Sequence, residues 1–228
     1  MKLIIQIPCH NEENTLHLVV QSIPKNIKGV DEIEVLVIDD GSDDRTLDVA
    51  EALETHIIDL PFKSGLAAAF QRGIDGSVGM GADVIVNTDG DNQYRSEDIP
   101  RLIQPILEGY DLVVADRQTD LIDEFSPLKK FLQKFGSWVA RKMTGVEVTD
   151  AVSGFRAYSR KFAARIKISS KFSHTLETLF LAKKYGARVT EIKVRTNPKM
   201  RESRLFKNIG EHVLKSGLAL IRLKWKYR

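Results

Sequence analysis

Short apolar runs alternate with helical patterns along the first half of the chain, and this alternation limits the possible folds more than any other feature. The runs are rich in Val and Ile and cover residues 2–8, 33–38, 56–60, 82–87 and 111–115. Helical patterns lie between them, over residues 11–22 with Asn11 as the expected N-cap, over 45–53 and 64–76, and onward from Ser96. Such an alternation is typical of βαβ units. It predicts an α/β fold with a mostly parallel sheet flanked by helices.

The second half of the chain is less regular. The elements expected there are two helices, a strand and a final helix, over residues 128–143, 174–185, 188–195 and 205–225. The apolar face of the final helix is formed by Phe206, Ile209, Val213 and Leu214. No flexible linker separates these segments. We therefore expect one domain over residues 1–204, followed by a basic amphipathic helix over residues 205–228.

Polar clusters follow three of the expected strands, at residues 9–13, 39–44 and 89–93. Parallel sheets bind ligands at the carboxyl ends of their strands, so we expect these clusters to share one edge and one site. The phosphate-binding patterns GxGxxG and GxxxxGKS/T are absent, which disfavours dinucleotide-binding and P-loop folds.

Two of these clusters contain paired carboxylates. Asp89 and Asp91 stand two positions apart and are followed by amides that include Gln93. Such hard oxygen donors suit Mg²⁺ or Mn²⁺, and the alternative is an ordinary acidic turn. Asp39 and Asp40 could accept hydrogen bonds from a nucleobase or ribose, and the alternative there is a turn that caps the next helix.

Charge is divided unevenly along the chain. The net charge is +3, but residues 193–228 carry +9 and residues 1–192 carry −6. Near the end, Trp225 and Tyr227 lie among four cations, Arg222, Lys224, Lys226 and Arg228. An apolar helix with aromatic and cationic residues favours an anionic membrane surface as partner over nucleic acid. The alternative is a helix packed on the domain with a solvated basic end.

The single cysteine, Cys9, rules out an internal disulfide and a zinc finger. It therefore indicates a reducing compartment. The first residues show no signal peptide, and no window reaches the ~18–20 apolar residues of a membrane span. We expect a protein that does not cross a bilayer.

Six segments in a fixed order resemble family 2 glycosyltransferases of the GT-A fold. They are IPCHNEENTL (7–16), VIDDGSDDRT (37–46), KSGLAAAFQRGI (63–74), NTDGDNQ (87–93), VVADR (113–117) and TDAVSGFRAYSR (149–160). The resemblance is strongest to the polyprenyl-phosphate (dolichol-phosphate) mannosyltransferase branch and covers roughly residues 1–210. It implies a Rossmann-like GT-A sheet and a glycosyltransferase that uses a nucleotide-sugar donor.

The resemblance implies a nucleotide-binding role for seven residues, namely Pro8, His10, Glu12, Asp39, Asp40, Lys63 and Asp89. The first three match the motif of the first strand, where the family often has tyrosine in place of His10. Asp39 and Asp40 match carboxylates beside the base and ribose. Lys63 is a candidate contact for the donor diphosphate.

The resemblance also implies the metal ligands, because Asp89, Asp91 and Gln93 match residues that hold Mg²⁺ or Mn²⁺. The family commonly has alanine where Gly90 stands, a difference that we expect to be neutral. Arg117 matches a basic residue close to the donor diphosphate. The residues expected to take part in catalysis are Asp91, Arg117 and Asp150.

The acceptor and diphosphate residues implied by the resemblance are Ser153, Gly154, Arg201, Ser203 and Arg204. Ser153 and Gly154 share a motif with Asp150, where many relatives hold a catalytic carboxylate. The last three lie in a stretch similar to the family's mobile basic loop, although the usual glycine before Glu202 and Ser203 is absent.

The expected reaction is inverting, metal-dependent transfer of a hexose from GDP-mannose to a polyprenyl phosphate, by a cytoplasmic protein that is peripheral on the membrane. A lipid phosphate is ionised near pH 7 and needs no general base, whereas a hydroxyl acceptor needs one, for which Asp150 is the candidate. One alternative is transfer of a UDP-linked sugar to a hydroxyl of a saccharide or lipid-linked glycan. The other is a catalytically silent nucleotide-binding module recruited to membranes.

Overall fold

The computed structural model describes residues 1–122, 124–170, 173–200 and 209–227, with the side chains of the last helix described from residue 217 onward. The strands in this part of the chain are β1 Lys2–Cys9, β2 Glu32–Asp39, β3 His56–Asp59, β4 Val84–Asn87, β5 Leu112–Asp116, β6 Arg156–Ser159 and β7 Val189–Lys193. The helices are α1 Leu16–Gln21, α2 Thr46–Ala52, α3 Leu66–Gly79, α4 Ile99–Leu107, α5 Pro127–Thr144, α6 Arg160–Ala163, α7 His174–Tyr185 and α8 Ile209–Lys226, with short 3₁₀ turns at Ser96–Asp98 and Thr119–Leu121.

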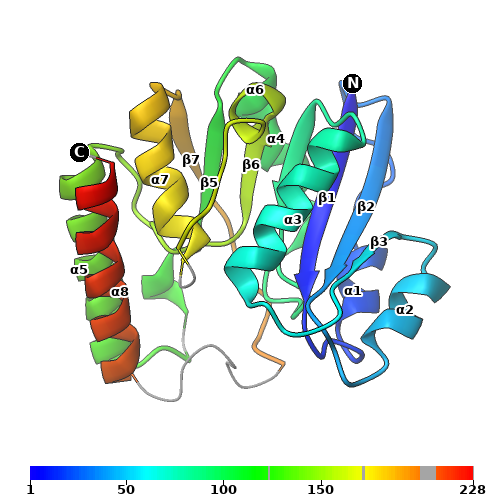
Figure 1. Cartoon of the computed structure of the whole chain (residues 1–228), viewed down its shortest axis with the longest axis horizontal. Helices are drawn as coiled ribbons and strands as arrows, with labels where there is room; N and C mark the ends of the chain where they lie inside the picture. The colour runs from blue at the N-terminus through cyan, green and yellow to red at the C-terminus, as the bar shows by residue number, and fades with distance from the viewer. Residues whose placement is uncertain (123, 171–172, 201–208, 228) are drawn as a thin grey trace.

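The strands form one seven-stranded sheet in the order β3-β2-β1-β4-β6-β5-β7. All neighbours are parallel except β6, which runs antiparallel to both β4 and β5. The carboxyl ends of β1, β2, β4 and β5 therefore meet the amino end of β6 at one edge of the sheet (Figure 1). The expected α/β fold with a mostly parallel sheet is confirmed.

Helices cover both faces of the sheet, which is why the central strands β1 and β4 are mostly apolar and buried. On one face, Ile4 and Ile38 pack with Phe70 of α3. On the other, Leu3 and Ile5 pack in a cluster with the buried residues of α1 and α4. Successive residues of β1 thus enter opposite cores, as the two-residue period of a strand requires.

The last helix is docked on the body of the protein. Helices α5 and α8 lie side by side at the β7 end of the sheet and both contact α7 (Figure 1). Ala219, Leu220 and Leu223 of α8 are buried in this contact. The expected boundary between residues 204 and 205 lies outside the described residues. None of the described helices is both long and apolar enough to cross a membrane.

A buried carboxylate fastens the end of α8. Tyr227 donates a hydrogen bond of 2.6 Å from its hydroxyl to Glu177 Oε1, and Lys226 Nζ lies 3.1 Å from the same oxygen. The backbone N–H groups of Ser169 and Ser170 donate to Glu177 Oε2. Burial alone would raise the pKa of Glu177, but these hydrogen bonds, that of Tyr227 first, hold it below its ordinary value.

Three local expectations differ from the structure. The helix expected to begin at Asn11 begins at Leu16, because the Asn11 backbone N–H donates to Ser42 Oγ and its φ is +60°. The segment from Ser96 starts as a 3₁₀ turn before α4. The sequence analysis missed β6, whose four residues include the polar Arg156. That residue interrupts the apolar run by which the other strands were found.

Candidate active site

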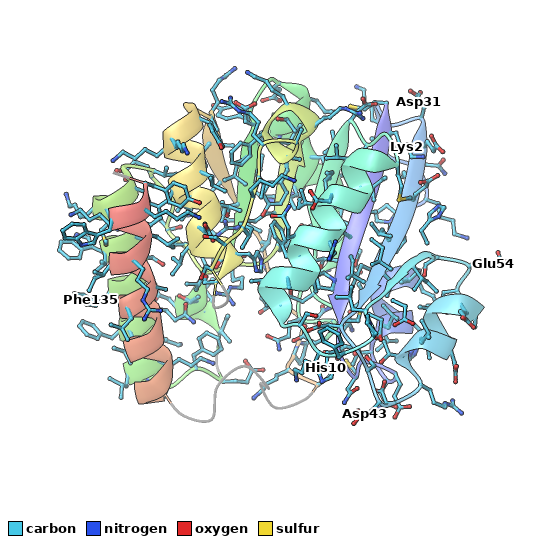
Figure 2. All side chains as sticks on the ribbon, in the orientation of Figure 1. Lys2, His10, Asp31, Asp43, Glu54 and Phe135 are labelled. Atoms are coloured by element: carbon cyan, nitrogen blue, oxygen red, sulfur yellow. The ribbon has the colours of Figure 1, made fainter. Side chains whose placement is uncertain are left out.

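The polar motifs come together at the edge where β1, β2, β4 and β5 end. Figure 2 places His10 and Asp43 at this edge. The loops after β1 and β2 are fastened to each other, because Asn11 and Asp43 exchange hydrogen bonds. The Glu12 backbone N–H also donates to Thr46 Oγ1 over 2.7 Å. The expected first-strand motif, from Pro8 through His10 to Glu12, is thus part of a rigid double loop.

The two carboxylates after β2 hold turns. Asp39 accepts a hydrogen bond of 3.0 Å from the backbone N–H of Ser42. Asp40 accepts hydrogen bonds from the backbone N–H groups of Ser64 and Gly65, over 2.6 and 2.8 Å. Both side chains are buried. The second pair of bonds fixes the segment that carries Lys63, which itself is exposed. A carboxylate has about four acceptor positions, so Asp39 and Asp40 keep capacity for a ligand.

The loop after β4 packs tightly on the β1 loop at Gly90. A Cβ on Gly90 would lie 2.8 Å from Cys9 Sγ and 3.2 Å from Glu12 Cγ. The first distance is shorter than van der Waals contact, so a Cβ at this position would require Cys9 or the Gly90 loop to shift. That glycine is a neutral replacement for the family's alanine stays a prediction. Burial also raises the pKa of Cys9 well above its ordinary value. The neutral thiol therefore acts as a packing group rather than as a nucleophile.

The donor chemistry of this loop fits a divalent cation. Asp89 and Asp91 offer carboxylate oxygens, and Gln93 offers an amide oxygen. Gln93 now donates a hydrogen bond of 2.8 Å from its amide nitrogen to Asp91 Oδ2. A half turn of that amide would present its oxygen instead. Among the described residues, no three His, Cys, Asp or Glu side chains already converge as a metal cluster. The set of two carboxylates and one amide fits Mg²⁺ or Mn²⁺ by donor type.

Arg117 and Asp150 form a buried, two-pronged ion pair. Arg117 Nε donates to Asp150 Oδ2 over 2.6 Å, and its Nη2 donates to Oδ1 over 2.9 Å. The side chain of Asp150 is 2% exposed. Burial alone would lower the pKa of Arg117, but the Asp150 carboxylate outweighs it and raises that pKa. Both oxygens of Asp150 thus accept hydrogen bonds from one guanidinium.

Gly154 is held against Asp89 by two side chains. Asn87 Nδ2 donates to the Gly154 carbonyl oxygen over 2.8 Å, and the Gly154 N–H donates to Tyr94 Oη over 2.9 Å. A Cβ on Gly154 would lie 3.2 Å from Asp89 Oδ1. Burial raises the pKa of Tyr94 to about 12, so its hydroxyl stays protonated. The acceptor-side motif therefore touches the expected metal site through a residue without a side chain.

The residues that support this loop belong to none of the motifs predicted to form the site. Gln6 Nε2 donates to Asn87 Oδ1 over 2.8 Å, which connects β1 to β4 inside the sheet. Arg156, fully buried, donates to the carbonyl oxygens of Ala151 and Ser153 and to that of Thr175 in α7. Burial lowers the pKa of Arg156. The sequence signal for these contacts is that Gln6 and Asn87 are polar residues within otherwise apolar runs.

Of the remaining acceptor-side residues, the structure describes only Ser153. Ser153 is fully buried, and among the described residues no hydrogen-bond partner of its hydroxyl is found. Arg201, Ser203 and Arg204 lie outside the described residues. The segment that leads to them runs along the metal-site loop, where Asn197 Nδ2 donates to the Asn92 carbonyl oxygen over 3.0 Å. The expected basic loop thus starts beside Asp91 and Gln93.

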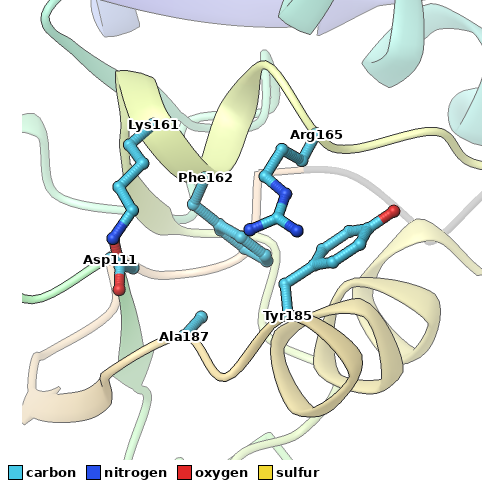
Figure 3. A pocket seen from close by; sticks show the side chains of 6 residues that line it. All are labelled: Asp111, Lys161, Phe162, Arg165, Tyr185 and Ala187. Atoms are coloured by element: carbon cyan, nitrogen blue, oxygen red, sulfur yellow. The ribbon is translucent and has the colours of Figure 1, made fainter.

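The hollow shown in Figure 3 lies at the opposite edge of the sheet. It is lined by Asp111, Lys161, Phe162, Arg165, Tyr185 and Ala187. The Arg165 guanidinium stacks on the Tyr185 ring, 4.0 Å from its centre. The room that remains suits little more than a water molecule, so this hollow is not a nucleotide site.

Comparisons with known proteins identify the family and the fold of the chain. The family model described as "Glycosyl transferase family 2" matches residues 4–167. An undecaprenyl-phosphate mannosyltransferase of Micrococcus luteus is 28% identical over 205 residues, which cover 85% of this chain and 83% of that protein. A UDP-N-acetylglucosamine–dolichyl-phosphate N-acetylglucosaminyltransferase of Methanococcus voltae is 26% identical over 213 residues, which cover 83% of each chain.

A solved structure extends the likeness to the fold. Glucosyl-3-phosphoglycerate synthase from Mycobacterium tuberculosis, in complex with Mn²⁺, UDP-glucose and phosphoglyceric acid, has a TM-score of 0.75 at 20% identity. The match covers 99% of this chain and 79% of that one. The expected GT-A-like fold and the resemblance to family 2 are confirmed. The chain belongs to glycosyl transferase family 2, and it is a glycosyltransferase.

Proposed function

We propose that this glycosyltransferase moves a hexose from a nucleotide sugar, GDP-mannose, to a polyprenyl phosphate with inversion at the anomeric carbon. The observation that carries the choice of acceptor is the pairing of Asp150 with Arg117. A hydroxyl acceptor needs a base to take its proton, whereas each oxygen of Asp150, the candidate base, already holds an N–H group of Arg117. An ionised lipid phosphate needs none. Relatives named for transfer to undecaprenyl and dolichyl phosphates support the same choice.

The reaction exchanges one bond at the anomeric carbon for another. The bond from that carbon to the nucleotide diphosphate breaks, and its electron pair leaves with the diphosphate. An oxygen of the lipid phosphate forms the new bond from the opposite side. Asp39 and Asp40 would receive the nucleoside, while the loop at Gly154 would place the acceptor beside Asp89, as the contact between Gly154 and Asp89 supports.

Asp89, Asp91 and Gln93 would hold Mg²⁺ or Mn²⁺, which would supply positive charge to the leaving diphosphate. The guanidinium of Arg117 is engaged by Asp150. Its positive charge still lies at the site edge and would favour the charge that develops there. In this proposal Asp150 positions Arg117 and takes no proton.

The lipid acceptor requires the enzyme to work at a membrane surface. We assign the protein a peripheral position on the cytoplasmic face of the membrane. The single cysteine fits a reducing compartment, and the basic residues 193–228 fit the anionic lipids of that face. GDP-mannose is the donor that the resemblance to the mannosyltransferase branch favours.

The test is a transfer assay with the purified full chain and a polyprenyl phosphate. GDP-mannose, UDP-glucose and UDP-N-acetylglucosamine are supplied separately, each with Mg²⁺, with Mn²⁺ or with a chelator, and lipid-linked hexose is identified by mass spectrometry. We expect product from GDP-mannose and its loss on chelation. Product from a UDP-sugar alone would refute GDP-mannose as the donor. Transfer to a glycan hydroxyl, with no transfer to the lipid phosphate, would refute polyprenyl phosphate as the acceptor.

A further inference from the structure

Exposed apolar side chains gather on two neighbouring helices. Of the eleven large apolar residues that are exposed in the described part of the chain, seven belong to α5 and α8. The four on α5 are Leu128, Phe131, Phe135 and Trp138. Their spacing of three to four residues places them on one face of the helix. Phe131, Phe135 and Trp138 stack in sequence, with ring centres 6.2 and 5.9 Å apart.

Helix α8 repeats this pattern beside α5. Leu218, Ile221 and Trp225 are 46%, 55% and 74% exposed and recur at the same helical spacing. The opposite side of α8 is buried against the body, so these three residues face away from it. Figure 2 places Phe135 on α5 pointing outward at the same end of the molecule. An exposed apolar surface made by two packed helices marks a site of interaction.

The charged side chains on the described parts of these helices, residues 127–144 and 217–227, are all positive. Residues 127–144 contain five Lys or Arg and no acid, and residues 217–227 contain three and no acid. The difference extends to the whole chain, since residues 1–126 carry −16 and residues 127–228 carry +19. The partner that fits this face is therefore both apolar and anionic. Aromatic residues with flanking cations are the composition found at the headgroup region of bilayers.

We propose that the exposed faces of α5 and α8 together dock on an anionic phospholipid bilayer, with the row Phe131–Phe135–Trp138 as its main anchor. The inference rests on the proposed function, because a lipid-linked acceptor lies in such a surface. It also corrects the emphasis of the sequence analysis, which assigned membrane contact to the C-terminal helix alone. Here α5 supplies more of the exposed aromatic surface than α8 does.

The topology of the sheet agrees with this orientation. Strands β6, β5 and β7 form the half of the sheet next to α5 and α8, while β1, β2 and β3 form the far half. The loop of Gly154, which precedes β6, thus lies on the membrane side of the site. The nucleotide-side residues Asp39 and Asp40, which follow β2, lie on the side that faces water. A lipid acceptor and a soluble donor would enter from opposite directions.

A second copy of the chain fits this face less well. Two such faces would bring only positive charges together, which opposes their association. The acidic half offers no matching apolar surface, because its exposed large apolar residues, Phe62, Leu107 and Leu121, lie on separate elements. A bilayer with anionic headgroups meets both requirements.

The chain provides its own probes, since its two tryptophans, Trp138 and Trp225, both lie on the proposed face. Tryptophan emission of the full chain is recorded with vesicles of phosphatidylcholine alone and with vesicles that contain about 30% phosphatidylglycerol. Neither donor nor acceptor is added. We expect a blue shift and quenching by brominated lipid with the anionic vesicles, and weakening of both by salt, because exposed charges are screened.

The matched variants keep both tryptophans. Phe131→Ser with Phe135→Ser should weaken binding to anionic vesicles at least about tenfold while thermal unfolding stays unchanged, since both side chains are exposed. Phe62→Ser removes an equally exposed phenylalanine from the acidic half and should leave binding unchanged. Turnover on a short, soluble acceptor should survive in the double variant.

Three results would overturn the proposal. The first is an emission spectrum that anionic vesicles leave unchanged, and the second is equal vesicle binding by the double variant and the wild type. The third is a blue shift that grows with protein concentration without lipid while light scattering reports a doubled mass, because the face would then join two copies. Vesicle binding without sugar transfer would leave this inference standing and refute the proposed function alone.

Discussion

The two halves of this molecule differ in charge, in regularity and in what they contribute to the site. Residues 1–126 carry −16 and form β1 to β5 in a regular alternation with helices. Residues 127–228 carry +19 and contribute β6, β7 and the helices α5, α7 and α8. The acidic half holds the carboxylates expected to meet a nucleotide and a metal. A diphosphate is itself anionic, so this half needs a cation before it can bind one.

At the junction between the two halves, the charges of the paired residues are opposite to the net charges of the halves that carry them. Arg117, a cation of the acidic half, pairs with Asp150, an anion of the basic half. Asn87 of the acidic half binds the Gly154 carbonyl of the basic half. Under the proposed function, the donor side would be built by one half alone, while the acceptor side would exist only where the halves meet. Each of the following changes tests a part of that division.

The largest effect is expected from Asp91→Asn, which removes a charge from the acidic half without touching the junction. Transfer should fall on the order of 10³-fold or more, because the metal site loses an anionic ligand. Initial rates are measured across Mg²⁺ and Mn²⁺ concentrations, with circular dichroism to verify the fold. Asp75→Asn, an exposed carboxylate paired with Lys167, serves as the control. Near-wild-type rates in Asp91→Asn at saturating metal would refute the metal site.

The next largest effect concerns the ion pair across the junction. Asp150→Asn leaves the Arg117 guanidinium buried without its carboxylate, so unfolding in urea should become easier by about 3–5 kcal/mol. Replacing both partners, by Arg117→Met with Asp150→Leu, should recover much of that loss in stability but not the activity. If Asp150→Asn unfolds with the wild-type midpoint, the pair does not hold the halves together.

A smaller effect is expected from Asn87→Leu. The change leaves the Gly154 carbonyl and the Gln6 amide without their partner, at a cost of about 1–3 kcal/mol for each buried group. The acceptor loop would lose its support, so kcat should fall while the KM for the donor stays unchanged. Adding Gln6→Leu removes the second unpaired group and should restore part of the stability without restoring kcat. If the double variant recovers stability and kcat together, Asn87 contributes to folding alone.

The sequence predicts the acidic half better than the junction for a physical reason. Strands such as β1 and β4 are buried on both faces, so their apolar runs stand out locally, and the motifs after them are contiguous. Strand β6 is short and carries Arg156, whose partners lie on α7 and on its own preceding loop. The hydrogen bond from Asn87 to the Gly154 carbonyl joins residues 67 positions apart. Such contacts depend on the tertiary fold, and local patterns do not encode them.

The smallest effect concerns α8, which belongs to the basic half alone. Because the folded-state pKa of Glu177 lies below its unfolded value of about 4.3, its contribution is complete above that value and is lost as pH falls through the folded pKa. Hydrogen exchange of α8 should therefore rise in acid before that of β1. Glu177→Gln should raise that exchange at neutral pH as well, whereas Glu147→Gln, on an exposed carboxylate, should not. Identical acid profiles for all three proteins would contradict the Glu177 contact.

The position of β6 also has a consequence for how the chain is made. Strand β5 pairs with β6 and β7 and not with β4, although it is synthesised long before either partner. While the ribosome is still adding residues 117–155, the sheet can grow only from β3 to β4, and β5 waits with an unpaired edge. Closing the loop between β4 and β6 is slow because their pairing spans about seventy residues. Synthesis therefore passes through an interval of aggregation risk, which ends when β6 enters the sheet.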